Sequence, residues 1–270
     1  MRSRGNIPSV MLPATVRRDI EHYVSAAHGV LPGFVEGLYV TGSIALGDYR
    51  PAISDVDLVA VCAEHPREPQ LEALSTLHRP SRPTFDVVYV TKGDLSRDPR
   101  ELSAPHSRGG AFKPDGAFNA NPVTWRQLAT GAIPVRGPRL TDADVWFDAD
   151  ALRRWNLANL ENYWVDSLQR WRRVEPHEAP VRHEYGLQWL VLGVPRLHYT
   201  IATLSVTSKT GAGQYALSVV DSGWHTLINT AIALRADRSA PLPMPVQALH
   251  RDAADLTAWL IEDARAQLDG

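Results

Sequence analysis

The chain has 270 residues, 44% of them hydrophobic and 21% charged, and its formal net charge at pH 7 is -2. This composition is typical of a soluble globular protein with one large domain or two ordinary ones. The near-neutral charge excludes a basic surface that binds nucleic acid through its phosphates alone, so a nucleic-acid partner is not expected.

Three further features bear on the compartment. The only cysteine, Cys62, cannot form an internal disulfide, which favours a reducing environment. Residues 1–14 contain no apolar segment of signal-peptide type. No uninterrupted apolar stretch approaches the ~18 residues of a membrane-spanning helix. We therefore expect a cytoplasmic protein with no membrane partner, and we expect it to be a monomer.

The first half of the chain has the pattern of a mixed α/β domain. Val16, Ile20 and Val24 recur near helical spacing, which predicts a helix over 13–31. Three short apolar segments predict strands, and a segment between the last two predicts a crossing helix. The strands are expected within 33–43 and at 56–62 and 85–90, and the crossing helix at 69–78. Residues 97–122 are rich in Pro, Gly and Arg, which predicts a long loop.

After about residue 148 the pattern changes to long helices. Residues 148–173 have helical periodicity, with Asp148 or Asp150 as the capping residue. Further helical segments follow at 184–206, 208–220, 223–237 and 245–268, and the first of these is more apolar than the helix before it. We therefore expect a bundle of about five helices that packs through its apolar faces.

Three carboxylates are expected to converge on one patch of the sheet. Side chains alternate along a strand, so Asp55 and Asp57 point the same way. Asp86 lies on the face of its strand opposite to Phe85 and Val87. If the two strands are neighbours, the three acids form a cluster that is unfavourable unless protons or metal ions neutralise it. Oxygen ligands alone favour a hard cation, Mg²⁺ or Mn²⁺, and these three acids are the predicted metal ligands.

A Gly-Ser pair supplies the other half of the chemistry. A short turn after the first strand, at Gly42 and Ser43, exposes backbone N–H groups that can hold a phosphate together with the Ser43 hydroxyl. A phosphate site beside a divalent metal is what phosphoryl or nucleotidyl transfer needs. The other interpretation is an ordinary turn followed by acids on a solvent-facing strand.

The turn at Gly42, the Asp-x-Asp pair that ends at Asp57 and the later Asp86 together resemble the polymerase-β-type nucleotidyltransferase superfamily. Residues 191–217 resemble the helical domain of the aminoglycoside 3''-adenylyltransferases, which act on streptomycin and spectinomycin. The positions that match this family's spacing are Arg196, Tyr199, Thr203, Lys209, Ala212 and Ala216. Residues 121–138 resemble the segment that joins that family's two domains.

The resemblance implies an α+β fold. An N-terminal nucleotidyltransferase α/β domain with a small mixed sheet is expected at 1–148, and a C-terminal all-α helical bundle at 149–270. The implied activity is that of a Mg²⁺-dependent nucleotidyltransferase, with two ions and with ATP as co-substrate, which transfers AMP to a hydroxyl of an aminoglycoside-like small molecule. Its role would lie in antibiotic resistance or in biosynthesis.

The resemblance also implies roles for single residues. Gly42 and Ser43 of the first domain, with Arg196 and Lys209 of the second, are expected to hold the triphosphate. Asp86 matches the general base of the family, which has a Glu at that position. The Asp side chain is one methylene shorter, so the alternative is that Asp86 is a third metal ligand, as in the wider superfamily.

The acceptor-binding part departs from the family. Gly186 and Trp189 occupy positions where the resemblance leads us to expect an acid and a histidine that grip a cationic drug. The long loop instead offers residues that suit a less cationic acceptor, namely His106, Arg108, Phe112 and Lys113. An enzyme that modifies a protein or RNA is therefore an alternative. A non-catalytic nucleotide sensor is a further one, against which the intact set of acids argues.

Three tryptophans lie on one expected helix, namely Trp155, Trp164 and Trp171. We favour packing in the bundle as their role, over stacking on a sugar or a base.

Overall fold

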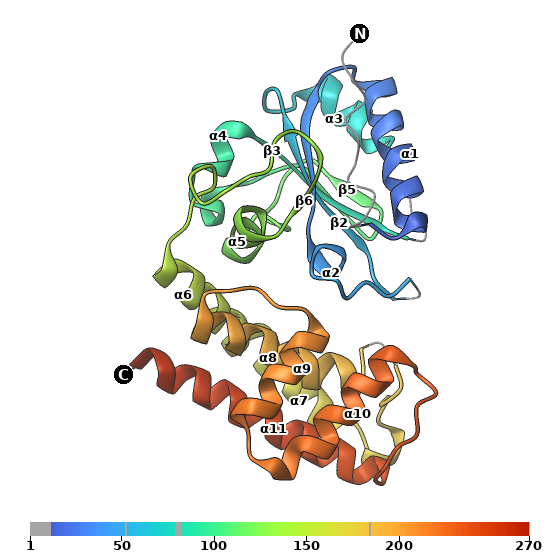
Figure 1. Ribbon diagram of the computed structural model, residues 1–270, viewed down its shortest axis with the longest axis vertical. Helices are drawn as coiled ribbons and strands as arrows, with labels where there is room; N and C mark the ends of the chain where they lie inside the picture. Colours follow the sequence, from blue (N-terminus) through green and yellow to red (C-terminus); the bar gives the residue numbers. More distant parts are fainter. Residues whose placement is uncertain (1–11, 52, 79–82, 184, 270) are drawn as a thin grey trace. The chain divides into compact units, whose positions relative to one another are not determined.

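The computed structural model describes residues 12–51, 53–78, 83–183 and 185–269. It divides into two compact units, Met1–Phe147 and Asp148–Gly270. Figure 1 shows a sheet with its helices in the first unit and a group of helices in the second. Among the described residues, every helix is too short or too polar to cross a membrane.

The first unit is built on a six-stranded mixed sheet with the order β5-β4-β3-β2-β1-β6. Its strands are β1 (Val35–Val40), β2 (Val56–Cys62), β3 (Phe85–Thr91), β4 (His106–Arg108), β5 (Ala111–Lys113) and β6 (Ile133–Arg136). β2 and β3 are parallel, and the other neighbouring pairs are antiparallel. Helix α3 (Glu68–Ser75) crosses between the parallel strands, so their amino ends lie at the same edge of the sheet.

Helices cover both faces of this sheet (Figure 1). On one face, α1 (Ala14–Val30) and α3 pack through apolar residues that include Ile20 and Leu74. On the other face, α5 (Pro122–Thr130) packs through Trp125. The residues of β2 alternate between these two cores, as the sequence predicts for a strand that is covered on both sides. Short helices α2 (Gly42–Ala45), α4 (Lys92–Leu95) and the 3₁₀ turn Pro99–Glu101 complete the unit.

The expectation of a long loop over 97–122 is wrong in part, because this segment contains the β4–β5 hairpin. The hairpin turn consists of Gly109 and Gly110, whose φ angles are 59° and 81°. Two-residue hairpin turns of type I′ need positive φ at both positions, and Gly-Gly is one of the pairs they favour. The Gly-Gly pair was therefore a hairpin signal within a segment that otherwise reads as a loop.

The second unit packs its described helices around one apolar core. They are α6 (Ala149–Asn159), the π-helical turn η2 (Leu160–Trp164), α7 (Val165–Arg173), α8 (Leu187–Thr203), α9 (Lys209–Val219), α10 (His225–Ala236) and α11 (Val246–Asp269), with 3₁₀ turns at Pro176–Glu178 and Ser222–Trp224. Asp148 caps α6, because its Oδ1 accepts a hydrogen bond of 2.6 Å from the Ala151 N–H. The α8 helix packs against α6, α9, α10 and α11 and is therefore central to the bundle.

Together, the mixed sheet of the first unit and the helices of the second confirm the expected α+β class.

Pro195 lies inside α8, where it removes the hydrogen bond to the carbonyl four residues earlier.

Candidate active site

Two acids lie side by side at the amino ends of the parallel strands. Asp57 of β2 and Asp86 of β3 are register partners. Partners in adjacent strands share a face, and the strands of a sheet are about 4.8 Å apart. The expected convergence of these two carboxylates is therefore a property of the observed sheet.

Asp55 lies one residue before β2, so it is at the strand's edge and not inside the strand. Its side chain is exposed, whereas that of Asp57 is half-buried. The Thr84 hydroxyl donates a short hydrogen bond to Asp55 Oδ1. Thr84 directly precedes β3, so this contact ties together the two chain segments that carry the acids.

Asp86 is the most buried of the three acids, with 7% of its surface exposed. The Gly109 N–H, in the turn of the β4–β5 hairpin, donates a hydrogen bond of 2.7 Å to Asp86 Oδ1. Burial raises the pKa of Asp86, and the charge of Asp55 adds to that rise, while the Gly109 N–H, Arg108 and His106 oppose it. The hairpin that the sequence did not predict therefore orients one oxygen of a predicted catalytic residue.

The Gly42 turn rests directly on Asp57. Gly42 has a φ of +61°, and a Cβ built on it would lie 2.6 Å from Asp57 Cγ. The Thr41 N–H also donates a hydrogen bond of 3.0 Å to the Asp57 carbonyl. Only glycine fits this position without strain, which explains why the phosphate-loop candidate and the acid can be so close.

Gln127 holds this turn through hydrogen bonds to Gly42, a contact that the sequence did not predict. The Gly42 N–H donates to Gln127 Oε1 at 3.1 Å, and Gln127 Nε2 donates to the Gly42 carbonyl at 3.2 Å. Gln127 lies on α5 with 6% of its surface exposed. A glutamine in an amphipathic helix carries no sequence signal for such a role. Since the Gly42 N–H is engaged by Gln127, Ser43 is the residue of this turn better placed to contact a phosphate.

The donor atoms of the three acids bear on metal binding. The part of the chain that the structure describes contains no group of three or more Asp, Glu, His or Cys side chains arranged to hold one metal ion. The chemistry of the donors still fits a hard cation, because neighbouring carboxylates on one sheet face need positive charge and offer oxygen ligands alone. The metal site at Asp55, Asp57 and Asp86 therefore stays a prediction.

The two predicted phosphate-binding cations lie on consecutive helices of the second unit. Arg196, on α8, donates from Nε to the Thr207 carbonyl at 3.4 Å. Lys209 is the first residue of α9, whose N-cap Ser208 accepts a hydrogen bond of 3.0 Å from the Gly211 N–H. Arg196 thus contacts the segment that leads into Lys209, and the shared phosphate-binding role of the two cations stays a prediction.

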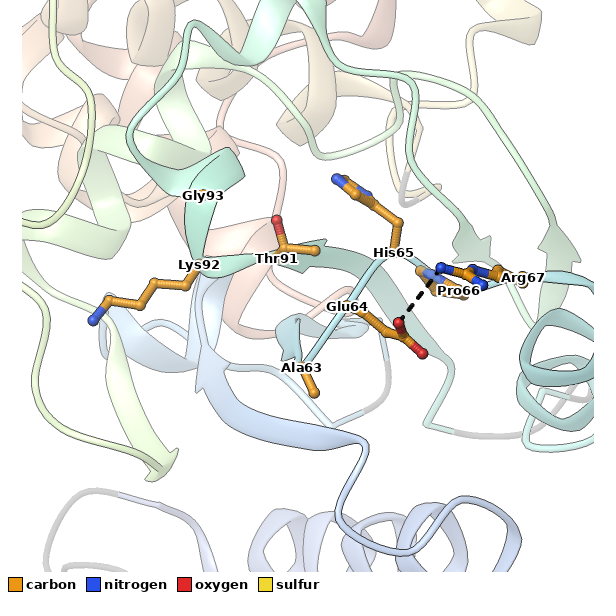
Figure 2. Close-up of a pocket in the computed structure, with 8 residues that line it drawn as sticks. All are labelled: Ala63, Glu64, His65, Pro66, Arg67, Thr91, Lys92 and Gly93. Atoms are coloured by element: carbon orange, nitrogen blue, oxygen red, sulfur yellow. Dashed lines mark ion pairs between the residues drawn. The ribbon is translucent and has the colours of Figure 1, made fainter.

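A pocket of about 500 Å³ lies at the opposite ends of the same two strands (Figure 2). It is lined by residues 63–67, which follow β2, and by residues 91–93, where β3 ends. Glu64 and Arg67 form an ion pair of 3.8 Å on one side, and the Lys92 side chain extends away from that pair. None of the predicted site residues lines this pocket, so it is separate from the acids.

Comparison with known proteins supports the first half of the sequence interpretation. Residues 23–103 match the family model of the nucleotidyltransferase domain. This segment contains the Gly42 turn and all three acids, so the predicted resemblance to the nucleotidyltransferase superfamily is confirmed. A search of functionally curated proteins gave no match.

A solved structure has a similar fold over both units. It is the spectinomycin adenyltransferase AAD(9) from Enterococcus faecialis, determined with ATP and spectinomycin. The TM-score is 0.58 at 13% sequence identity, and the match covers 90% of this chain and 98% of that one. At this identity the likeness concerns the fold.

The contact between Gly42 and Asp57 can be tested with two matched glycine variants. Gly42→Ala places a side chain at positive φ and against Asp57, whereas Gly47, with a φ of +67°, has open space around its Cβ. Both substitutions should cost roughly 1–2 kcal/mol through backbone strain, and Gly42→Ala should cost more because of the overlap. Urea unfolding and calorimetry with Mg-ATP are the measurements. Equal destabilisation, with equal nucleotide affinity in the two variants, would contradict the contact.

Proposed function

We propose, on the premise that residues 23–103 form a nucleotidyltransferase domain, that the protein transfers AMP from ATP to a hydroxyl of an aminoglycoside-like small molecule. The proposal rests on one observation. Asp57 and Asp86 lie side by side on adjacent strands, and the turn at Gly42 is in close contact with Asp57. This arrangement offers a place for a metal-bound triphosphate directly beside a carboxylate that can take a proton.

In the reaction, the acceptor hydroxyl oxygen forms a bond to the α-phosphorus of ATP while the bond from that phosphorus to the bridging oxygen breaks. Pyrophosphate leaves with the electron pair of the broken bond. Asp86 takes the hydroxyl proton. The Gly109 N–H occupies Asp86 Oδ1, which leaves Oδ2 for the proton.

Asp55 and Asp57 would hold Mg²⁺, with Asp86 as the third candidate ligand. When bound, Mg²⁺ supplies neutralising charge for the triphosphate. Ser43 lies in the turn against Asp57, so its hydroxyl suits a phosphate oxygen, and the role of Gly42 is to keep that turn close to the acid.

Arg196 and Lys209 of the helical unit are the further residues that we propose to bind the triphosphate. Guanidinium and ammonium groups are strong donors to phosphate oxygens. The structure of similar fold, AAD(9), was determined with ATP and spectinomycin, which supports ATP as the nucleotide tested here.

The direct test is incubation with ATP labelled at the α-phosphate, Mg²⁺ and a panel of acceptors that includes spectinomycin and streptomycin. We expect label in the acceptor and release of one pyrophosphate for each acceptor modified. Expression in a susceptible bacterial host should then raise the inhibitory concentration of the drug that is modified. Hydrolysis of ATP without a labelled acceptor from any class would contradict the proposal.

The role of Asp86 as the base predicts a specific kinetic change. Asp86→Asn should leave Mg-ATP affinity nearly intact and lower kcat by ~10²–10⁴, the usual contribution of a positioned base. Asp86→Glu, which keeps a carboxylate, is the matched control and should retain more activity. A parallel loss of Mg-ATP affinity in Asp86→Asn would instead make Asp86 a metal ligand.

The same variant has a predicted effect on stability without ligand. Because burial raises the pKa of Asp86, the fold favours its protonated form, and this contribution to stability is lost as pH rises through the folded-state pKa. Asn has no such charge. The melting temperature of Asp86→Asn relative to wild type should therefore rise between acidic and neutral pH.

Arg196 offers a test of the contribution from the helical unit. Mg-ATP should raise the melting temperature of the wild-type chain, since it binds the folded state. Arg196→Ala should reduce that gain by the loss of a charged phosphate contact, roughly 1.5–3 kcal/mol. Arg154, with 67% of its side chain exposed, is the control, and Arg154→Ala should keep the full gain. An Arg196→Ala variant with unchanged ATP affinity would remove Arg196 from the site.

A further inference from the structure

We propose that the helical unit carries a ring-binding platform, formed by Tyr163, Tyr185 and Trp189, for the C–H face of a saturated, hydroxyl-bearing ring such as a sugar or a cyclitol. The identification of this ring as part of the acceptor rests on the proposed function. The platform itself rests on the arrangement of residues within the helical unit.

Trp189 is the centre of the platform. Its ring centroid lies 4.5 Å from that of Trp164 at an interplanar angle of 33°, so Trp164 covers one side of it. Tyr163 is 5.9 Å from Trp189 at 82°, and Tyr185 is 6.5 Å from it at 72°. Two tyrosine rings therefore stand nearly perpendicular to a fixed indole.

The two tyrosines are unusually exposed for aromatic residues. Tyr163 has 49% and Tyr185 64% of its surface exposed, while the supporting Trp164 has 6%. Clustered apolar surface open to water is typical of binding sites, and packing alone would bury these rings. Tyrosine adds a hydroxyl to an apolar ring, which suits a ligand that also combines apolar C–H faces with a rim of hydroxyls.

The backbone under the platform is adapted to this arrangement. Tyr163 and Trp164 lie in the π-helical turn η2, a kind of turn that occurs frequently at functional sites. A Cβ on Gly193 of α8 would lie 2.6 Å from Trp164 Cζ2, so only glycine lets this indole approach the helix. Both a π-turn and a glycine inside a helix cost stability, and both serve to seat Trp164 beside Trp189.

The chemistry around the platform favours recognition through the ring face. His183 packs against Tyr185 with ring centroids 5.7 Å apart, and Arg182 is its neighbour in sequence. Glu161, in the same π-helical turn as Tyr163, forms an ion pair with Arg265. Glu184 precedes Tyr185 in sequence. Stacking on the uncharged rings is not an ionic contact, so affinity that depends on it should respond little to salt.

The experiment measures binding of spectinomycin, streptomycin and myo-inositol to the full chain by calorimetry, at low and high salt. The test variant is Tyr163→Leu with Tyr185→Leu, which removes both exposed rings and keeps apolar side chains. The control is Trp259→Leu, a partly exposed tryptophan on α11 that packs against Trp224. Melting temperature and Mg-ATP affinity are measured for each protein.

We expect at least one of these ring compounds to bind the wild type, and its Kd to rise about 10-fold or more in the double variant, in line with the usual worth of a stacking contact. The control should bind as the wild type does, and Mg-ATP affinity should stay the same in all three proteins. The proposal is overturned if none of the compounds binds the wild type, if the double variant binds equally well, or if it loses Mg-ATP instead, which would assign the rings to the nucleotide base.

These outcomes are distinct from those of the proposed function. Ring binding that depends on the tyrosines, with no AMP transfer to any acceptor, would keep the platform and remove the proposed function. AMP transfer with an unchanged acceptor KM in the double variant would keep the proposed function and remove the platform.

Discussion

Repulsion between Asp57 and Asp86 is the constraint on which the first unit depends. Their strands are paired in parallel register, so the backbone keeps the two acids side by side on one face of the sheet. Asp86 is also buried, and burial disfavours its charged form. The fold answers part of this cost with the Gly109 N–H on one Asp86 oxygen and with the nearby charges of Arg108 and His106. A divalent cation, as proposed for this site, would add further compensation.

The turn beside the acids is held by close contacts that leave no room for a side chain at Gly42. Gly42 lies against the Asp57 carboxylate because it has no side chain, and Gln127 holds both its N–H and its carbonyl. Ser43 directly follows Gly42 in this turn. The backbone beside Asp57 is therefore compact, as the proposed neighbouring phosphate and metal sites would need.

Local sequence patterns predicted much of this arrangement. They did not predict the contacts between residues far apart in the chain. Alternation along β2 placed Asp57 on its face, and the helix between β2 and β3 made parallel pairing with Asp86 the natural outcome. The contact from Gln127 to Gly42 spans 85 residues, and nothing near either residue indicates it. The Gly109 contact was missed because a segment rich in Pro and Gly was interpreted as a loop, although its Gly-Gly pair is typical of a hairpin turn.

The most direct test of the account is whether the acids bind the nucleotide through a metal. ATP affinity should be measured by calorimetry in Mg²⁺ and in EDTA, for the wild type, for Asp57→Asn and for Asp115→Asn, an exposed acid in the same unit. The account predicts affinity at least about 10-fold higher with Mg²⁺ in the wild type and in Asp115→Asn, because bare carboxylates repel the triphosphate. That difference should vanish in Asp57→Asn. Equal ATP affinity in Mg²⁺ and EDTA for the wild type would contradict the account.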